Sequence, residues 1–349
     1  MTSLLITAEI QKYMKDIVFI KTNNLWHKQH TPLITIITSN YNRREVLLRC
    51  MKSVESQTFR DIEYIVVDNG STVSFDNIME QFMKEATIPV MFIKRSCGIG
   101  RHTGRNSAIE QARGEYLCLI DSDDAYLPKA METLVNAWNS IPKEKRVEYR
   151  EVVAQCRDEH GNRCGAPFPE GINECSIKEA FKIVQRPELG YEHANMSRTI
   201  LLKENPFLNP EGVTDSTETI IWWRLAKKYK SFFINDIVRV YYTESGDSIT
   251  NFYKKGLTKN ACISSLWRDQ YYLNHWNDFL FPFKDRVKRA MYYTVWKNAL
   301  NRHNMYPTYD WAKEGLKGFI NNALMIALWL PGKFVTKWYL NRHEDLINK

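Results

Sequence analysis

The chain has 349 residues, of which 44 % are hydrophobic and 13 % aromatic. This length suits one large domain or two moderate ones, and the apolar content excludes a disordered chain. Lys and Arg (48) outnumber Asp and Glu (40), which gives a formal net charge of +8. A mild positive charge suits nucleic acid, an anionic membrane surface or a phosphate-bearing substrate, and it does not choose among them.

The cysteines and the N-terminus bear on where the protein works. Seven cysteines form no close-spaced framework, and their odd number favours a reducing compartment, so we expect a cytoplasmic protein. A zinc site could use Cys156, His160, Cys164 and Cys175, but the usual short spacing between cysteine ligands is missing, which disfavours it. The N-terminus lacks the features of a signal peptide, and no run of about 18 apolar residues predicts a transmembrane helix.

The first half of the chain alternates short apolar runs with amphipathic segments. The strand-like runs, rich in Ile and Val, are Leu33–Ser39, Glu63–Gly70, Pro89–Lys94 and Tyr116–Asp121. The segments with apolar residues at helical spacing are Arg44–Gln57, Phe75–Ala86 and Thr103–Gly114. This alternation predicts an α/β fold with right-handed βαβ units and a doubly wound, mostly parallel sheet. Such sheets bind ligands beyond the carboxyl ends of their strands.

The pattern loosens further along the chain. Strands are predicted at Val147–Cys156 and Asp236–Thr243, and a helix at Ser216–Tyr229. From about residue 251 the chain is aromatic, basic and helix-like. We therefore expect an N-terminal extension over residues 1–30, an α/β domain over 31–250 with halves at 31–140 and 141–250, and a helical C-terminal region over 251–349.

Polar clusters follow the four strands of the first half. They read "TSNYN" (38–42), "DNGST" (68–72), "CGIGRHTGRN" (97–106) and "DSDD" (121–124). Any one of them could cap a helix or bend a turn, but successive strand ends of this kind form a nucleotide pocket. A Rossmann glycine turn and a P-loop are both disfavoured, because "TSNYNRRE" after the first strand contains no glycine.

The "DSDD" cluster places Asp121, Asp123 and Asp124 within four positions. Three crowded carboxylates repel one another unless a cation or a set of hydrogen-bond donors compensates them. Carboxylates at a strand end suit a hard divalent cation, and a pyrophosphate can supply the remaining oxygen ligands. One of the three could instead cap the following helix.

Together these features resemble the family 2 glycosyltransferases of the GT-A fold, which use nucleotide-diphosphate sugars and invert the anomeric centre. The stretch from Thr35 to Thr72 is similar to the opening of that family, and "GRNSAIEQARGEYLCLIDSDD" is similar to its "ARNxGIxxAxGEYIxFLDSDD" segment. The resemblance is close over Pro32 to about Leu134 and looser to about Tyr242. It implies that residues 31–140 bind a nucleotide sugar and that 141–250 bind the acceptor.

The resemblance assigns roles to individual residues. Asp123 would coordinate Mg²⁺ or Mn²⁺, and Asp124 would either support the metal shell or cap the next helix, of which we favour the cap. Asn69 and Gly98 depart from the family pattern, which usually has Asp and Asn at these positions. The residues expected on the nucleotide sugar are Thr38, Tyr41, Asp68 (toward the uracil), Arg105, Asp121 (toward the ribose) and Ser122.

Inversion needs a base that takes the proton of the attacking hydroxyl. The family places this base in an "ED" pair before a helix that reads "LWLRLA"; aligning it with "IIWWRLA" gives Glu218 as the candidate base. Asp215 is the rival candidate, with a helix cap as its other interpretation. His193 and Trp222 are weaker candidates for contact with the acceptor.

The basic, tryptophan-bearing C-terminal region suits an interfacial helix on an anionic membrane, and equally a helix that covers the catalytic core or a partner in a homodimer. We expect a UDP-sugar donor, a glycan or lipid-linked acceptor, and a place in bacterial polysaccharide, O-antigen or capsule synthesis. Two other functions stay open: a nucleotidyltransferase of related sheet architecture, and a basic nucleic-acid-binding protein. The second is disfavoured because the basic residues are spread and no binding module is recognisable.

Overall fold

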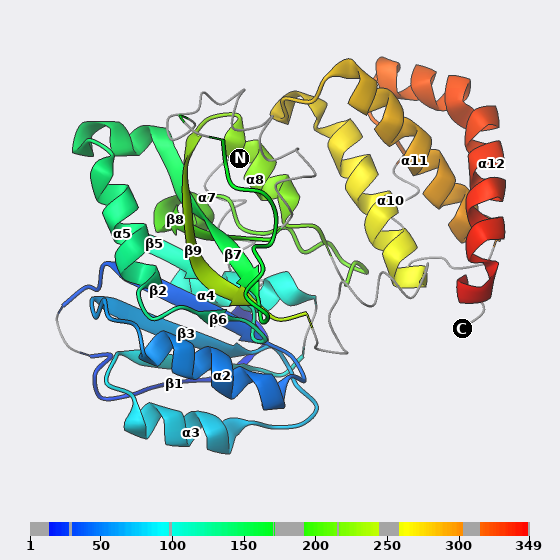
Figure 1. Cartoon of the computed structure of the whole chain (residues 1–349). Helices are drawn as coiled ribbons and strands as arrows, with labels where there is room; N and C mark the ends of the chain where they lie inside the picture. Colours follow the sequence, from blue (N-terminus) through cyan, green and yellow to red (C-terminus); the bar gives the residue numbers. More distant parts are fainter. Residues whose placement is uncertain are drawn as a thin grey trace. The chain divides into compact units, whose positions relative to one another are not determined.

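The structure is a computed structural model in which the chain folds into two compact units (Figure 1). The first unit comprises residues 1–207 and 228–245, and the second comprises 208–227 and 246–349. Side chains are described up to residue 338. The residues that the structure describes are 14–27, 30–97, 100–169, 171, 192–214, 216–243, 258–302 and 315–347.

The first unit is built on a mixed sheet. Its helices are α2 (Arg44–Glu55), α3 (Asp76–Glu85), α4 (Arg101–Gln111), α5 (Ala130–Ser140), the 3₁₀ helix η1 (Lys143–Glu148) and α7 (Thr199–Glu204). Its strands are β1 (Ile17–Thr22), β2 (Ile34–Asn40), β3 (Ile62–Asp68), β4 (Val90–Arg95), β5 (Tyr116–Leu119), β6 (Ala125–Tyr126), β7 (Tyr149–Asp158), β8 (His193–Arg198) and β9 (Lys230–Tyr241).

The order of the strands sets the position of the site. The described strands form one nine-stranded sheet in the order β1-β4-β3-β2-β5-β8-β7-β9-β6. The four strands β4, β3, β2 and β5 pair in parallel, and so do β7 and β9, whereas the other neighbours are antiparallel. The chain moves from β2 outward to β4 and then returns to pair β5 on the other side of β2. This reversal creates a switch point at the carboxyl ends of β2 and β5, where such sheets bind ligands.

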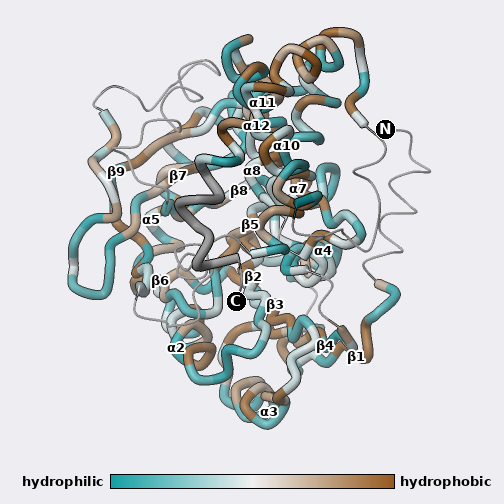
Figure 2. The backbone as a smooth tube through the Cα atoms, turned by 90° about the vertical axis from the view of Figure 1, so that its right-hand side faces the viewer, coloured by the Kyte–Doolittle hydropathy of each residue, from teal (hydrophilic) through white to brown (hydrophobic). Residues whose placement is uncertain are grey.

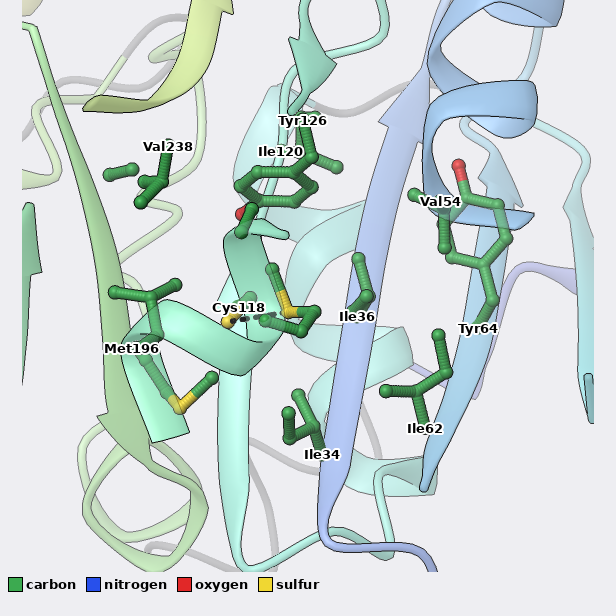
Figure 3. Close-up of a cluster of buried hydrophobic side chains, with 14 of the residues drawn as sticks. Ile34, Ile36, Val54, Ile62, Tyr64, Cys118, Ile120, Tyr126, Met196 and Val238 are labelled. Atoms are coloured by element: carbon green, nitrogen blue, oxygen red, sulfur yellow. Dashed lines mark hydrogen bonds between the residues drawn. The ribbon is translucent and has the colours of Figure 1, made fainter. Parts of the chain in front are cut away.

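The core beneath one face of the sheet holds these strands in place. In β2 and β3 the side chains of Ile34, Ile36, Ile62 and Tyr64 are at most 1 % exposed. They pack with Val54 of α2 and with residues of α3 and α5, and Figure 3 shows how the strand and helix side chains interlock. Brown and teal residues alternate along α2 and α3 in Figure 2, as expected for helices with one buried face.

The predicted elements of the first half are confirmed to within three residues at each end, and the predicted α/β class is confirmed. Three strands were not predicted: β1, the two-residue β6, and β8. The prediction that Asp124 caps a helix is wrong, because β6 follows it and α5 begins only at Ala130, with Lys129 at the N-cap position.

The second unit contains α8 (Thr219–Ala226), α10 (Lys259–Asn274), the 3₁₀ helix η4 (Trp276–Asp278), α11 (Phe283–Arg302) and α12 (Phe319–Ile347). The buried Asp269 of α10 joins the helices, because it accepts hydrogen bonds from Arg289 at 2.8 Å and from Trp296 at 3.1 Å, both on α11. α11 packs on both α10 and α12 (Figure 1). Among the described residues, none of the helices combines the length and apolar character needed to cross a membrane.

Candidate active site

Three buried side chains with unsatisfied polar atoms lie at the carboxyl ends of β2 and β3. Asn40 and Asp68 end these strands as direct neighbours in the parallel register, and Asn69 follows. The side chains are at most 3 % exposed, yet within the described residues no hydrogen bond reaches Asn40 Oδ1, Asn40 Nδ2, Asp68 Oδ2 or Asn69 Oδ1. Such groups cost free energy when buried without a partner, so their clustering at a strand edge indicates a ligand site. We call Asn40, Asp68 and Asn69 the strand-end cluster.

Close backbone contacts shape the loops around this cluster. Asn42 adopts a positive φ of 55°, and its Oδ1 accepts a hydrogen bond from the Thr72 N–H at 2.8 Å, which ties the "TSNYN" and "DNGST" loops together. On the other side, α4 approaches so closely at Gly104 that a Cβ there would lie 2.4 Å from Ser39 Oγ and 3.0 Å from Asn69 Cγ. A larger residue at position 104 would have to displace the Ser39 hydroxyl and the Asn69 side chain.

The predicted nucleotide residues on β2 and β3 differ in their surroundings. The Asp68 carboxylate accepts a hydrogen bond from the Ser71 N–H at 2.8 Å, and its pKa is raised by burial despite that bond. Tyr41 lies in the loop with its side chain about half exposed, at 51 %. Thr38, in contrast, points into the core, where its hydroxyl accepts a hydrogen bond from Tyr64 at 2.8 Å. The structure therefore does not place the Thr38 side chain at the pocket.

Asp121 has the surroundings of a permanently ionised carboxylate. Arg105 donates a hydrogen bond to it at 2.6 Å, while about half of the Asp121 side chain, 52 %, is exposed. Loss of part of its hydration would raise the pKa of Asp121, but the nearby guanidiniums of Arg105, Arg239 and Arg101 outweigh this effect and lower the pKa to about 2. Asp121 thus presents a charged hydrogen-bond acceptor, as a contact with ribose hydroxyls requires.

Arginines also compensate Asp123. The Arg43 guanidinium, from the end of the "TSNYN" loop, pairs with the Asp123 carboxylate, whose side chain is 10 % exposed. Arg49 of α2 donates a hydrogen bond to the Asp123 carbonyl and stacks on the Tyr242 ring, with its Cζ 3.4 Å from the ring centroid. The repulsion within "DSDD" is therefore relieved by guanidinium groups.

Asp124 contacts the end of β9. Its side chain is buried, its Oδ1 accepts a hydrogen bond from the Tyr242 N–H at 3.3 Å, and its Oδ2 lies 3.5 Å from Arg239 Nε. Burial raises the pKa of Asp124 to about 8 despite the charge of Arg239. Asp124 therefore anchors the end of β9 to the "DSDD" loop, which is the role it has in place of the expected cap.

The carboxylates of Asp121 and Asp123 fit a divalent cation by their chemistry, since hard cations prefer carboxylate oxygens. Among the described residues no group of three or more His, Cys, Asp or Glu side chains is arranged to hold a metal ion. A site with only two carboxylates, Asp121 and Asp123, is consistent with this finding if a bound diphosphate supplies the remaining oxygen ligands. For the zinc alternative, Cys156 is buried and Cys175 lies outside the described residues.

The remaining predicted residues fall in several places. Ser122 is buried in the "DSDD" loop, and the ring of His193 on β8 stacks on Phe168 at 5.3 Å between centroids. Glu218 occupies the N-cap position of α8, and Trp222 lies on the same helix, both partly exposed in the second unit. Asp215 lies outside the described residues.

Sequence reasoning missed four residues that surround the carboxylates and the strand-end cluster: Asn40, Arg43, Arg49 and Arg239. Asn40 and Arg43 belong to the stretch "TSNYNRRE", so their position after the first strand was an available signal. Arg49 and Arg239 reach the "DSDD" loop from α2 and β9, and no local pattern pointed to them.

Comparison with known proteins agrees with this geometry. Residues 35–145, which contain the strand-end cluster and the "DSDD" loop, match the model of glycosyl transferase family 2. The comparison identifies residues 35–145 as a glycosyl transferase family 2 domain. The match includes β2 to β5, the strands whose ends carry the polar clusters, so the glycosyltransferase domain and the candidate site coincide.

Curated relatives extend the similarity beyond residue 145. A GalNAc(5)-diNAcBac-PP-undecaprenol beta-1,3-glucosyltransferase of Campylobacter jejuni is 27 % identical over 230 residues, which cover 66 % of this chain and 70 % of that protein. An uncharacterised glycosyltransferase of Methanocaldococcus jannaschii is 25 % identical over 243 residues, which cover 68 % of this chain and 81 % of that protein.

Solved structures confirm the GT-A fold with a helical C-terminal region. Staphylococcus aureus TarS, residues 1–349 in complex with UDP-GlcNAc, superposes with a TM-score of 0.52 at 16 % identity, covering 84 % of this chain and 79 % of TarS. The same TarS fragment in complex with UDP gives a TM-score of 0.51 at 15 % identity, and the superposition covers 87 % of this chain and 91 % of the TarS fragment.

Proposed function

We propose that this family 2 glycosyltransferase transfers a sugar, with inversion and with the help of a divalent cation, from a UDP-sugar to a hydroxyl of a glycan or lipid-linked acceptor. The observation that carries the proposal is the strand-end cluster, because its buried polar atoms are left without partners at the position where the fold binds nucleotides. In this proposal the nucleobase supplies the missing partners.

The chemistry of the cluster favours uracil. Asp68 Oδ2 is a buried acceptor that can receive the uracil N3–H, and the Asn40 amide can both donate to and accept from the base edge. The exposed Tyr41 ring is available to stack on the base. The TarS complexes with UDP and UDP-GlcNAc support a uridine donor for this fold.

The "DSDD" loop would receive the ribose and the diphosphate. Asp121, held ionised by Arg105, accepts hydrogen bonds from ribose hydroxyls. Asp123 would hold Mg²⁺ or Mn²⁺, with Asp121 as a neighbouring carboxylate, and the cation would neutralise charge on the departing diphosphate. Arg43 must then leave Asp123, and it becomes free to pair with a phosphate oxygen instead.

Glu218 is our candidate for the base, and Asp215 is its rival. In the reaction the acceptor oxygen bonds to the anomeric carbon as the bond from that carbon to the diphosphate oxygen breaks. The base takes the hydroxyl proton, and UDP leaves with the bonding electrons. Glu218 suits this role by its position, because it is a partly exposed carboxylate at the start of α8. His193 and Trp222 are proposed to contact the acceptor.

The relatives inform the proposed acceptor. The Campylobacter jejuni relative is named for a glycan on undecaprenol diphosphate, and another relative, from Staphylococcus epidermidis, is a teichoic acid poly(glycerol phosphate) polymerase, 28 % identical over 107 residues. Both names concern bacterial surface polymers or their lipid-linked precursors. We therefore place this chain in bacterial polysaccharide synthesis, with cytoplasmic UDP-sugar as donor.

Replacing Asn40 by Leu tests the role of the strand-end cluster. We expect Asn40→Leu to stabilise the folded protein by about 1–3 kcal/mol, because it removes a buried amide that has no partner. The same change should weaken UDP binding about tenfold, because one or two hydrogen bonds to the base are lost. Denaturant unfolding and calorimetric titration with UDP measure the two effects.

Asn106→Leu is the matched control for stability. Asn106 is equally buried, but both ends of its amide bond the Phe207 backbone, at 2.8 and 3.0 Å, so its loss should destabilise the protein. If Asn40→Leu lowered stability as Asn106→Leu does and left UDP affinity unchanged, the strand-end cluster would have a structural role only. The proposal that it binds the nucleobase would then be refuted.

A further inference from the structure

One side of α12 is apolar and exposed. Its opposite side is buried: Asn321 donates a hydrogen bond to the Leu273 carbonyl of α10 at 2.8 Å, and Gly332 lies so close to Thr294 of α11 that a Cβ would approach Thr294 Cγ2 to 2.5 Å. The outward side presents large side chains that are 48–87 % exposed, an unusual density for a surface helix. This α12 apolar face consists of Phe319, Ile320, Ile326, Trp329, Leu330, Phe334 and Trp338.

A basic groove adjoins the α12 apolar face. It lies between the end of α11 and α12, encloses about 600 Å³, and carries three cations, Arg302, Lys333 and Lys337, beside the apolar Leu330 and Phe334. The ammonium of Lys333 also lies 3.9 Å from the centroid of the Trp329 ring. From residue 315 to residue 343 the sequence contains no Asp or Glu. The surface therefore combines positive charge with apolar bulk and lacks compensating acids.

The positive charge of this surface, together with its apolar side chains, indicates what kind of partner it binds. A second copy of the chain seated on the same face would bring two sets of Arg302, Lys333 and Lys337 together, and like charges oppose such contact. Nucleic acid would satisfy the cations but would leave large apolar side chains in water. An anionic lipid surface suits both the cations and the apolar side chains. Its phosphates can pair with the cations, while the tryptophan, phenylalanine and aliphatic side chains enter the boundary between headgroups and acyl chains.

We propose that the α12 apolar face and its basic groove form a docking surface for an anionic phospholipid bilayer, with the helix lying in the plane of the interface. The groove takes the phosphate of a lipid headgroup, while Lys333 and Lys337 extend to the polar layer. The proposal concerns the second unit alone and does not depend on the donor, the metal or the base proposed above.

Vesicle sedimentation tests the docking surface directly. The full chain should bind vesicles of phosphatidylcholine mixed with phosphatidylglycerol, and bind pure phosphatidylcholine vesicles far more weakly. Lys333→Gln with Lys337→Gln should reduce the partition coefficient on the anionic vesicles roughly thirtyfold, because each basic residue near such a surface contributes about one factor of five. Phe334→Ser should reduce it at least about tenfold, because the ring no longer enters the boundary.

Matched variants elsewhere control for charge and hydrophobicity. Lys143→Gln with Lys145→Gln removes two exposed lysines from η1, and Val147→Ser removes an exposed apolar side chain from the same helix. Both variants should bind anionic vesicles as strongly as the wild-type chain. All substituted residues are exposed, and circular dichroism should show unchanged folding. Absence of binding to anionic vesicles, or a dimer in light scattering that Phe334→Ser disperses, would overturn the proposal.

Discussion

Glu218→Gln is expected to lower the rate of sugar transfer by about 10²–10⁴-fold, the usual contribution of a general base, while the affinity for the nucleotide sugar stays the same. The substitution keeps the size of the side chain and removes only the ability to accept a proton. Because Glu218 precedes the first residue of α8, Thr219, and Gln has the same shape as Glu, the helix should remain folded. Single-turnover transfer rates and calorimetric donor binding measure the two quantities.

Two variants make this result interpretable. Glu211→Gln changes another exposed carboxylate in the segment before α8 and should leave the transfer rate unchanged. Asp215→Asn tests the rival: a slow Asp215→Asn variant together with a fully active Glu218→Gln variant would move the base to Asp215. Full activity in both variants would refute the proposal that either carboxylate takes the hydroxyl proton.

Asp123→Asn should have the second large effect. The substitution removes the carboxylate proposed to hold the cation, so Mn²⁺ should no longer strengthen donor binding. Transfer should fall by at least about 10²-fold, because a metal ion contributes several kcal/mol of charge stabilisation in such reactions. The Arg43 guanidinium would lose its ion pair with Asp123, but it is partly exposed and can be hydrated.

Asp124→Asn is the neighbouring control for Asp123→Asn. Asp124 Oδ1 accepts a hydrogen bond from the Tyr242 N–H, and Asp124 Oδ2 lies 3.5 Å from Arg239 Nε, so this carboxylate is engaged in holding β9 and is not the one proposed to bind the cation. The variant should therefore keep the dependence of donor binding on Mn²⁺, even if its stability changes. An Asp123→Asn variant that still responds to Mn²⁺ as the unchanged chain does would contradict the assignment of Asp123 as the metal ligand.

The fold could largely be predicted because the sequences of its central strands are apolar and rich in β-branched residues. Runs such as "TIITS" and "YIVV" have few alternatives to buried parallel strands, and the amphipathic segments between them fix the crossovers. β8 could not be predicted in this way, since "HANMSR" lacks β-branched residues and becomes a strand only by pairing with β5 and β7. The two-residue β6 likewise depends on β9.

The site was predicted in position but only partly in detail. Thr38 and Asn40 share one face of β2, but Thr38 still meets Tyr64 in the core, whereas Asn40 ends the strand with its amide unsatisfied. Sequence spacing could not separate these two environments. Arg43 and Arg239 compensate the aspartates from 80 and 115 residues away in the chain, a pairing that only the folded sheet creates.

The measurement that tests the central claim most directly is a thermal-shift titration of the full chain with a panel of nucleotide sugars, each with and without Mn²⁺. Binding to the folded state raises the midpoint of unfolding in proportion to the logarithm of ligand concentration over its dissociation constant. The account predicts a metal-dependent rise with at least one UDP-sugar, smaller in Asn40→Leu relative to that variant's own midpoint. No rise with any nucleotide sugar would contradict it.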